Sequence, residues 1–335
     1  PPVVGAADII TSDPREAAKA DLILLVLPAF AHAPTLKALA PYLPDAVVLG
    51  AIPARSGFEL QADYYLKLKS TKRVIFCGQT LPWACRVLEP GRKVKVLGSK
   101  NNVGLATVPS NYATELCSWF SRVLKVDFIP MQGALAVSLG NIGQVIHPGI
   151  MYGLLKNYDG AVWSEEQIPL FYQGVTEEIA DRLEALSDEI VRIAQLFSHN
   201  YRLNLDEVLT VRQWLFRAYS ATIEDSSSLA RAFTTNHSYR GLKVPVIKVN
   251  SGYKPDFGSR YLTEDIPYGL LYSKAVATMI DFPTPTIDQI IKVTGKWTGK
   301  KYLDDNGQIS GPDIAEGRIP QNFGIKDPLQ LVQFG

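Results

Sequence analysis

The sequence predicts a doubly wound α/β domain followed by a mostly α-helical domain. Short, continuous apolar runs such as the one within Asp21–Leu27 suit strands that are buried on both faces of a parallel sheet. Over the first ~130 residues these runs alternate with segments of helical periodicity, which is the pattern of βαβ units. From Gln132 onward the periodic segments are helical. A chain of 335 residues also fits two domains.

The strands and helices of the first domain follow in order. The first strand, Asp21–Leu27, is closed by Pro28. The other expected strands are Ala46–Gly50, Arg73–Cys77, Lys93–Leu97 and Val126–Ile129. The expected helices are Pro34–Tyr42, Phe58–Leu68 and Ser110–Leu124, with Ser110 as the N-cap of the last. We expect right-handed crossovers between the parallel strands.

The second domain is expected to be helical, with its boundary near residue 131. The clearest helix is Thr176–Phe197, whose apolar residues fall on one stripe. The remaining helices are expected at Leu205–Tyr219, Ser227–Phe233, Tyr268–Ile280 and Thr286–Lys296, with Thr286 as a cap. The prediction is therefore a partial dinucleotide-type domain over 1–131 and a helical domain over 132–335.

Composition excludes several classes of protein. The chain has 34 basic and 33 acidic residues, a net charge of +1, so no sequence-wide field draws it to nucleic acid or an anionic membrane. The longest apolar run, Leu22–Phe30, is too short to span a bilayer. Three cysteines without metal-ligand spacing argue against a disulfide scaffold or a metal site. We expect a reducing, cytoplasmic environment and neither a membrane nor a nucleic-acid partner.

Ligands of open α/β sheets bind at the carboxyl ends of the strands. The loops at these ends are expected at Pro28–His32, Ala51–Gly57 and Gly78–Arg86. They contain small, polar and proline residues, which suits loops shaped around a ligand and also describes many ordinary connections. No Gly-x-Gly-x-x-Gly turn lies between a strand and a helix, so the pattern alone supports nucleotide binding only weakly.

Several segments, taken together and in order along nearly the whole chain, give a more specific signal. They are Leu27–His32, Ser56–Gln61, Thr80–Arg86, Gly91–Gly98, Ile146–Ile150, Pro169–Gly174, Thr234–Asn236, Pro255–Gly258 and Arg260–Pro267. With these segments the chain resembles the opine dehydrogenases, most closely the octopine dehydrogenase type. The resemblance implies a Rossmann domain plus a helical domain, with substrates in the cleft between them.

The same resemblance implies the reaction and the cofactor. Members of the family condense an amino acid with a 2-oxo acid, usually pyruvate, and reduce the imine with NADH. We therefore expect NAD(H) as cofactor, pyruvate and an amino acid as partners, and a monomer or homodimer. Relative to the family, roughly 60 residues before Pro1 are expected, including the glycine-rich ~30-residue βαβ unit. Without that unit we expect poor solubility or no activity.

Three residues match the family's catalytic positions. His147 is expected to be the acid/base, because histidine titrates near neutral pH. Asp265 would orient its imidazole, and Arg260 would hold the carboxylate of pyruvate through paired hydrogen bonds. The structural alternatives are a histidine packed beside Pro148, an aspartate that only caps a helix, and an ordinary surface arginine.

Four further residues are expected at the amino-acid site. Arg55 and Cys85 match the family's positions for this substrate, and Cys85 agrees with the octopine type. Arg55 departs from that type, which has glutamine there. Its positive charge should repel arginine and favour taurine or a small neutral amino acid. Asn141 and Trp83 complete the site, although Asn141 could simply end a helical turn and Trp83 could be a core aromatic.

The nicotinamide side is expected at Pro28, Ala29, Phe30 and His32, which follow a central strand. Phe30 could instead pack in the core.

Three other functions remain open at this stage. One is octopine formation from L-arginine. Another is a non-catalytic remnant that binds a ligand or partner. The last is an ordinary 2-hydroxy-acid or sugar-phosphate dehydrogenase on the same scaffold.

Overall fold

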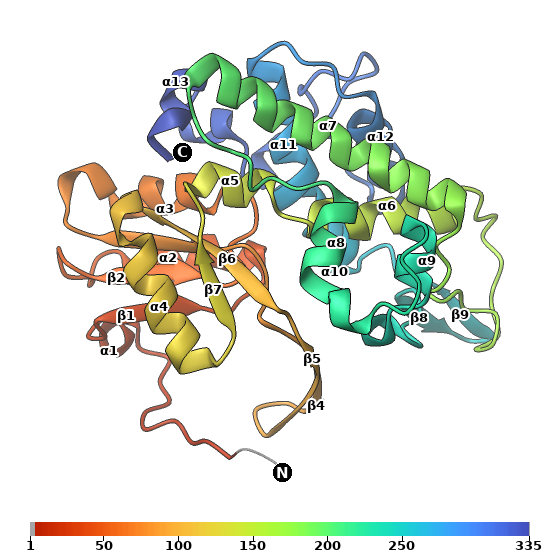
Figure 1. Cartoon of the computed structure of the whole chain (residues 1–335), viewed down its shortest axis with the longest axis horizontal. Coiled ribbons are helices and arrows are strands. Elements are labelled where there is room, and N and C mark those ends of the chain that lie inside the picture. Colours follow the sequence, from red (N-terminus) through yellow and green to blue (C-terminus); the bar gives the residue numbers. More distant parts are fainter. Residues whose placement is uncertain (1–3, 335) are drawn as a thin grey trace.

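The computed structural model describes residues 4–334 and places a five-stranded sheet in the N-terminal part of the chain (Figure 1). The strand order is β1-β2-β3-β6-β7. The strands are β1 (Leu22–Leu25), β2 (Val48–Ala51), β3 (Val74–Gly78), β6 (Asn102–Val108) and β7 (Asp127–Pro130). The first three are parallel, β6 runs antiparallel to β3, and β7 is parallel to β6. The predicted α/β class is confirmed.

Helices cover both faces of this sheet. They are α1 (Pro14–Ala17), α2 (Ala29–Leu39), α3 (Phe58–Leu66) and α4 (Ala113–Leu124). Successive residues of a strand point to opposite faces. Ile75 and Cys77 therefore enter the large core that contains α2, α3 and the helical domain. Phe76 points the other way and packs against Phe120 of α4, with ring centroids 5.1 Å apart. Apolar residues on both faces explain why these strands carry uninterrupted apolar runs.

The C-terminal part is built around α7 (Glu177–Tyr201), the long helix across the top of Figure 1. Its apolar stripe is buried, and Thr176 caps it by accepting a hydrogen bond from the N–H of Ile179. At Gly149 of α6 (Gly143–Leu155), a Cβ would lie 2.5 Å from a terminal methyl of Leu183 on α7, so a larger residue here would require the leucine side chain to move. The other helices are α5 (Ala134–Leu139), α6 (Gly143–Leu155), α8 (Val211–Tyr219), α9 (Leu229–Thr234), α10 (Arg260–Thr263), α11 (Leu271–Met279), α12 (Pro285–Thr298) and α13 (Pro328–Leu331).

Several predicted elements need correction. Lys93–Leu97 does not join the main sheet. It lies in β5 (Lys93–Ser99), which forms an exposed hairpin with β4 (Trp83–Glu89). The alternation of lysine and valine is the pattern of an exposed strand and not of a doubly buried one. The strand that does join the sheet, β6, was missed because its buried residues include Gly104 and Ala106, which are weak strand formers.

Smaller corrections concern the helical half. It contains a hairpin, β8 (Val246–Val249) with β9 (Gly252–Pro255), in addition to its helices. The N-cap position of α12 is Thr284 and not Thr286, because Pro285 already begins the helix. Ser110 begins a short 3₁₀ turn that precedes α4, whose own N-cap residue is Tyr112. Between residues 4 and 334, no helix is long and apolar enough to cross a membrane.

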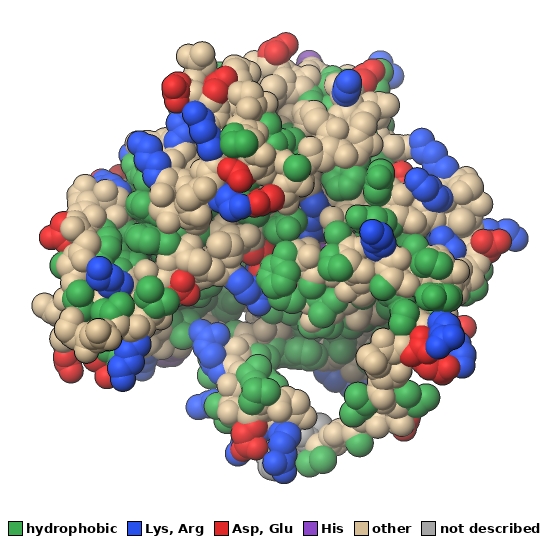
Figure 2. All heavy atoms as spheres, turned by 180° about the vertical axis from the view of Figure 1, so that it is seen from behind, with side chains coloured by type: hydrophobic (Ala, Val, Ile, Leu, Met, Phe, Trp, Pro, Cys, Tyr) green, Lys and Arg blue, Asp and Glu red, His purple; other side chains and the backbone are tan. Residues whose placement is uncertain are grey.

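Surface charge is mixed over the face shown in Figure 2. Lysine and arginine side chains alternate there with aspartate and glutamate and do not gather in one patch. The three cysteines, Cys77, Cys85 and Cys117, carry free thiols.

A buried polar cluster joins the two parts of the chain. Ser138 of α5 donates to the carboxylate of Glu59 on α3 at 2.8 Å, and Tyr272 of α11 donates to it at 3.0 Å. The Ser138 hydroxyl also accepts the N–H of Gly57 at 2.9 Å. Glu59 is 1% exposed, and this burial raises its pKa to about 7 although the two hydroxyl donors oppose the shift.

Glu59 is therefore expected to make stability depend on pH. Between about pH 4.5 and 7, the folded protein holds a proton that the unfolded chain has released. Stability contributed by this group is present below that window and falls as the pH rises through it, by roughly 3 kcal/mol at most. Urea unfolding at pH 5 and pH 8 should show this loss in the parent protein and a smaller one in Glu59→Gln. An equal loss in both proteins would contradict the assignment.

Candidate active site

A cleft of about 780 Å³ lies between the loops of the α/β domain, the base of the β4–β5 hairpin and the helical domain. Seven of the residues predicted from the sequence line it, and they come from both parts of the chain. They are Arg55, Trp83, Cys85, Asn141, His147, Arg260 and Asp265. Residues that are far apart in the sequence thus converge on one site.

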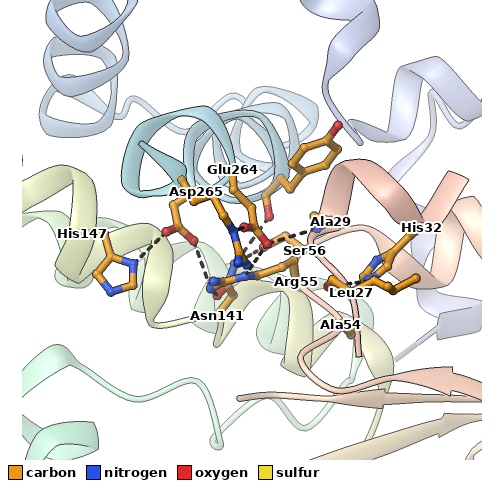
Figure 3. Close-up of polar contacts among 12 residues, drawn as sticks. Leu27, Ala29, His32, Ala54, Arg55, Ser56, Asn141, His147, Glu264 and Asp265 are labelled. Atoms are coloured by element: carbon orange, nitrogen blue, oxygen red, sulfur yellow. Dashed lines mark hydrogen bonds and ion pairs between the residues drawn. The ribbon is translucent and has the colours of Figure 1, made fainter. Parts of the chain in front are cut away.

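His147 and Asp265 form a close pair (Figure 3). The imidazole projects from α6, and its Nδ1 lies 2.7 Å from Oδ2 of Asp265, which precedes a short π-helical turn over Ile266–Leu270. The Asp265 side chain is 1% exposed and makes no capping hydrogen bond to this turn. Its carboxylate is therefore directed at the histidine rather than at the backbone of the following helix. This contact fixes the tautomer with the proton on Nδ1 and leaves Nε2 unprotonated in the neutral ring.

Arg55 is bound by carboxylates of the helical domain. Its Nη1 lies 3.0 Å from Oδ1 of Asp265, and its Nε lies 3.2 Å from Oε1 of Glu264. The backbone of Arg55 has φ +60°, a left-handed conformation that costs a non-glycine residue of order 1 kcal/mol. The structure thus directs the side chain toward the helical domain. The positive charge that was expected to repel an arginine substrate is thus offset by two buried carboxylates.

Glu264 is a site residue that the sequence analysis missed. It is fully buried, and one oxygen accepts from both Arg55 and the backbone N–H of Ala29, at 3.2 and 3.1 Å. The other oxygen accepts from Nε of Arg260 at 2.5 Å. The four-residue spacing from Arg260 and the position beside Asp265 were the available signals. Glu264 therefore holds Arg260, whose side chain is 57% exposed, at the edge of the cleft.

Asn141 lies between α5 and α6 and supports this group. Its side-chain oxygen accepts from Arg55 Nη1 at 3.3 Å, and its Nδ2 donates to Ser56 Oγ at 3.2 Å. Asn141 is 2% exposed, so its amide is largely committed to protein partners. Trp83 and Cys85 belong to β4 and are half-buried at the base of the hairpin.

The segment after β1 lies behind the cleft. Pro28, Ala29, Phe30 and His32 are absent from its lining. The backbone of Ala29 is held from both sides, because Glu264 accepts its N–H and Arg318 Nη2 donates to its carbonyl at 3.3 Å. His32 is fully buried beside Arg318, and burial together with that charge lowers its pKa to about 3. Phe30 is 57% exposed and borders a separate cavity.

Two ionisable groups of the cleft, Asp265 and Lys100, have shifted pKa values. Burial opposes ionisation of Asp265, but the positive charges of Arg55 and His147 outweigh it and keep the pKa of the carboxyl below its usual value. Lys100, which also lines the cleft, has its pKa lowered to about 8 by burial and by the charge of Arg55. Its ammonium donates to the carbonyl of Leu81 at 2.6 Å.

The fold and the site together define a two-domain protein of the dehydrogenase type, with a hydrogen-bonded histidine–aspartate pair in the cleft between an α/β domain and a helical domain. Comparison with known proteins agrees with this class. The model of the NAD/NADP octopine/nopaline dehydrogenase α-helical domain matches residues 130–298. Octopine dehydrogenase of Mizuhopecten yessoensis is 38% identical over 95% of this chain and 80% of its own length.

Two further comparisons are informative. Tauropine dehydrogenase of Arabella iricolor is 32% identical over 95% of this chain and 81% of its own length. A solved structure of octopine dehydrogenase with NADH and L-arginine superposes with a TM-score of 0.88, at 35% identity, covering 98% of this chain and 82% of the other. The chain belongs to the octopine and nopaline dehydrogenase family.

The pair of His147 and Asp265 leads to a direct prediction. Asp265→Asn removes the charge that selects the Nδ1-protonated tautomer, so kcat should fall by about 10²–10⁴-fold. Steady-state kinetics with saturating substrates would measure this loss. Asp305→Asn, at an exposed position, serves as the control and should keep the parental rate. An Asp265→Asn protein that is folded and retains more than about a third of the parental kcat would contradict the assigned geometry.

Proposed function

We propose that this chain is an NADH-dependent opine dehydrogenase that joins an amino acid to pyruvate through an imine. The observation that carries the proposal is the convergence of His147, Asp265 and Arg260 in one interdomain cleft, in a chain of this family. The reaction needs one group that moves protons at a carbonyl oxygen and another that binds a carboxylate. A histidine oriented by an aspartate supplies the first, and an arginine supplies the second.

The residues of this chain fit the nicotinamide end of the cofactor. Pro53 and Arg55 follow β2 and line the cleft, which places the carboxyl end of a central strand at the site. We propose that the segment Pro28–Phe30 after β1 lies against the nicotinamide, because Glu264 ties the backbone of Ala29 to this site and Phe30 is exposed. When bound, NADH supplies the hydride that reduces the imine.

Arg260 is proposed to bind the carboxylate of pyruvate. Only its Nε is engaged by Glu264, so the two terminal nitrogens are available for a planar carboxylate. Glu264 keeps the guanidinium at the cleft, and Arg260 would in turn hold the keto group near His147. A lysine could not make both hydrogen bonds in this fork geometry.

His147 is proposed to carry protons from the amine nitrogen to the keto oxygen. Neutral Nε2 accepts a proton from the ammonium group of the amino acid, whose nitrogen lone pair then forms the C–N bond as the C=O π pair moves to oxygen. The imidazolium returns that proton to oxygen. A second proton follows the same route, the C–O bond breaks, and water leaves as the nitrogen lone pair forms C=N. The histidine ends neutral, and Asp265 stabilises its charged intermediate.

We propose taurine or a small neutral amino acid as the second substrate. Of the cations that line the cleft, Arg55 is paired with Glu264 and Asp265, and Arg260 is assigned to pyruvate, which leaves Arg86 and Lys100 against the carboxylate of Asp256. Asp265 is already committed to His147 and Arg55. The balance favours a substrate with an anionic end and no cationic side chain, and Lys100 is a suitable partner for a carboxylate or sulfonate.

L-Arginine is the second candidate, because octopine dehydrogenase of Mizuhopecten yessoensis is 38% identical to this chain and a similar octopine dehydrogenase structure contains NADH and L-arginine. Asp256 is the carboxylate in the described cleft lining that could face a guanidinium.

The three free thiols also support our proposal of a reducing, cytoplasmic location.

A substrate panel tests the proposal. NADH oxidation by the full-length protein is followed with pyruvate alone and with pyruvate plus taurine, alanine, glycine or arginine. We expect oxidation only when both substrates are present, with kcat/KM for taurine or a small amino acid at least about tenfold above that for arginine. Preference for arginine would overturn the substrate class. NADH oxidation with pyruvate alone would overturn opine formation. Absence of oxidation with every combination of substrates would overturn it too.

Substitution of Lys100 tests the proposal that a positive charge in the cleft binds the anionic end of the amino acid. Lys100→Gln should raise KM for the preferred amino acid about tenfold or more, because a charge-assisted hydrogen bond is lost. KM for pyruvate should stay within about threefold of the parent. Lys95→Gln, on the exposed strand of the same hairpin, should change neither constant.

A further inference from the structure

A phenol that the mechanism above does not use lies against the reactive nitrogen of His147. We propose that Tyr172 is a further catalytic residue, whose hydroxyl donates a hydrogen bond to the same substrate oxygen that His147 protonates. This inference rests on the proposed function, since it concerns the same site. It assigns His147 and Tyr172 as two donors that converge on one oxygen atom.

The geometry places the two groups at the same point of the cleft. Tyr172 Oη lies 3.5 Å from Nε2 of His147, and both residues line the cavity. Because Nδ1–H of His147 donates a hydrogen bond to Asp265, Nε2 of the neutral ring is an acceptor and the tyrosine hydroxyl is the donor. A substrate oxygen that lies on the Tyr172 side of Nε2 can therefore be within hydrogen-bond distance of both groups.

Aromatic stacking fixes both side chains. The Tyr172 ring stacks on Tyr239 with centroids 3.9 Å apart and an interplanar angle of 14°. Phe233 continues this stack at 6.2 Å from Tyr172. On the other side of the site, the imidazole of His147 stacks on Tyr261 at 4.2 Å and 11°. Neither ring can turn away without breaking its stack, so the distance between hydroxyl and imidazole is set before substrate binds.

The chemistry of the hydroxyl fits a donor and not a base. Tyr172 is 8% exposed, and burial raises the pKa of its phenol well above the usual value, so it stays protonated through the neutral range. The keto oxygen gains negative charge as the amine adds to the carbon. A preorganised donor aimed at this developing charge lowers the barrier without transferring its own proton.

Tyr172→Phe tests the proposal, because phenylalanine keeps the stacked ring and removes only the hydroxyl. We expect kcat to fall by about 10²-fold, while KM for pyruvate and for NADH stays within about threefold. Tyr239→Phe is the matched control: it removes a hydroxyl from the same stack, at a ring whose hydroxyl bonds Tyr219 instead of His147. This control should keep a kcat within about twofold of the parent.

The pH profile of kcat/KM separates a catalytic hydroxyl from a merely structural one. The charged groups around His147 are Asp265, Arg55 behind it, Arg260 on α10 and Arg86 on β4. All of these remain in Tyr172→Phe. Loss of the donor to neutral Nε2 should therefore shift the midpoint attributed to the histidine to higher pH, whereas Tyr239→Phe should leave it in place.

The outcomes distinguish this inference from the function on which it rests. If the parent protein forms no opine, the proposed function fails first. If the parent forms opine and Tyr172→Phe keeps the parental kcat and pH midpoint, the inference is overturned while the function stands. A Tyr172→Phe protein that unfolds would make the hydroxyl structural and would also overturn the inference.

Discussion

Two adjacent buried carboxylates, Glu264 and Asp265, constrain everything around the cleft. Both belong to the helical domain, both are at most 1% exposed, and both reach the guanidinium of Arg55 in the α/β domain. Removing one member of a buried ion pair typically costs about 3–5 kcal/mol, because the remaining charge is left without a partner away from water. The two domains are therefore joined by charge at the point where the site is assembled (Figure 3).

Each contact of this group has a consequence for the chemistry. Asp265 selects the tautomer of His147, and Glu264 holds Arg260 at the mouth of the cleft. Glu264 also accepts the N–H of Ala29, so the first turn of α2, which was expected from the sequence to be a loop, is tied to the carboxylate that holds Arg260. The left-handed backbone of Arg55 fits this arrangement, since strained residues persist where the surroundings over-determine them. The proposed acid/base, the proposed carboxylate anchor and the proposed cofactor segment thus share one support.

Sequence reasoning reached the parts of the structure that local pattern determines. The apolar runs of β2 and β3 are almost fully buried, that of β1 is half-buried at an edge of the described sheet, and α7 buries one continuous stripe, so their periods were readable. The strand β6 was not readable, because Gly104 and Ala106 carry no strand signal and its antiparallel placement follows from tertiary packing. The hairpin β4–β5 was misread because a short strand pattern does not reveal which sheet it joins.

The same distinction applies to the site. Motif resemblance identified His147, Asp265 and Arg260, and the structure brings all three to one cleft. Glu264 was overlooked although it lies beside Asp265, since a charged residue in a helical segment is usually solvated. Tyr172 was overlooked because its role depends on the stack with Tyr239, 67 positions further along the chain. Partners that distant leave no local pattern, and the pairing of Arg55 with two carboxylates is of the same kind.

A double-mutant cycle between Arg55 and Glu264 tests most directly whether a shared ion group holds the site together. Unfolding free energies in urea would be measured for Arg55→Gln, Glu264→Gln and the double variant. The same cycle on the half-exposed surface pair of Arg212 and Glu184, 2.7 Å apart, would serve as the reference. We predict that the double variant loses at least about 2 kcal/mol less than the sum of its single losses, against under about 1 kcal/mol for the surface pair. Additive losses at Arg55 and Glu264 would contradict a buried ion group as the support of the site.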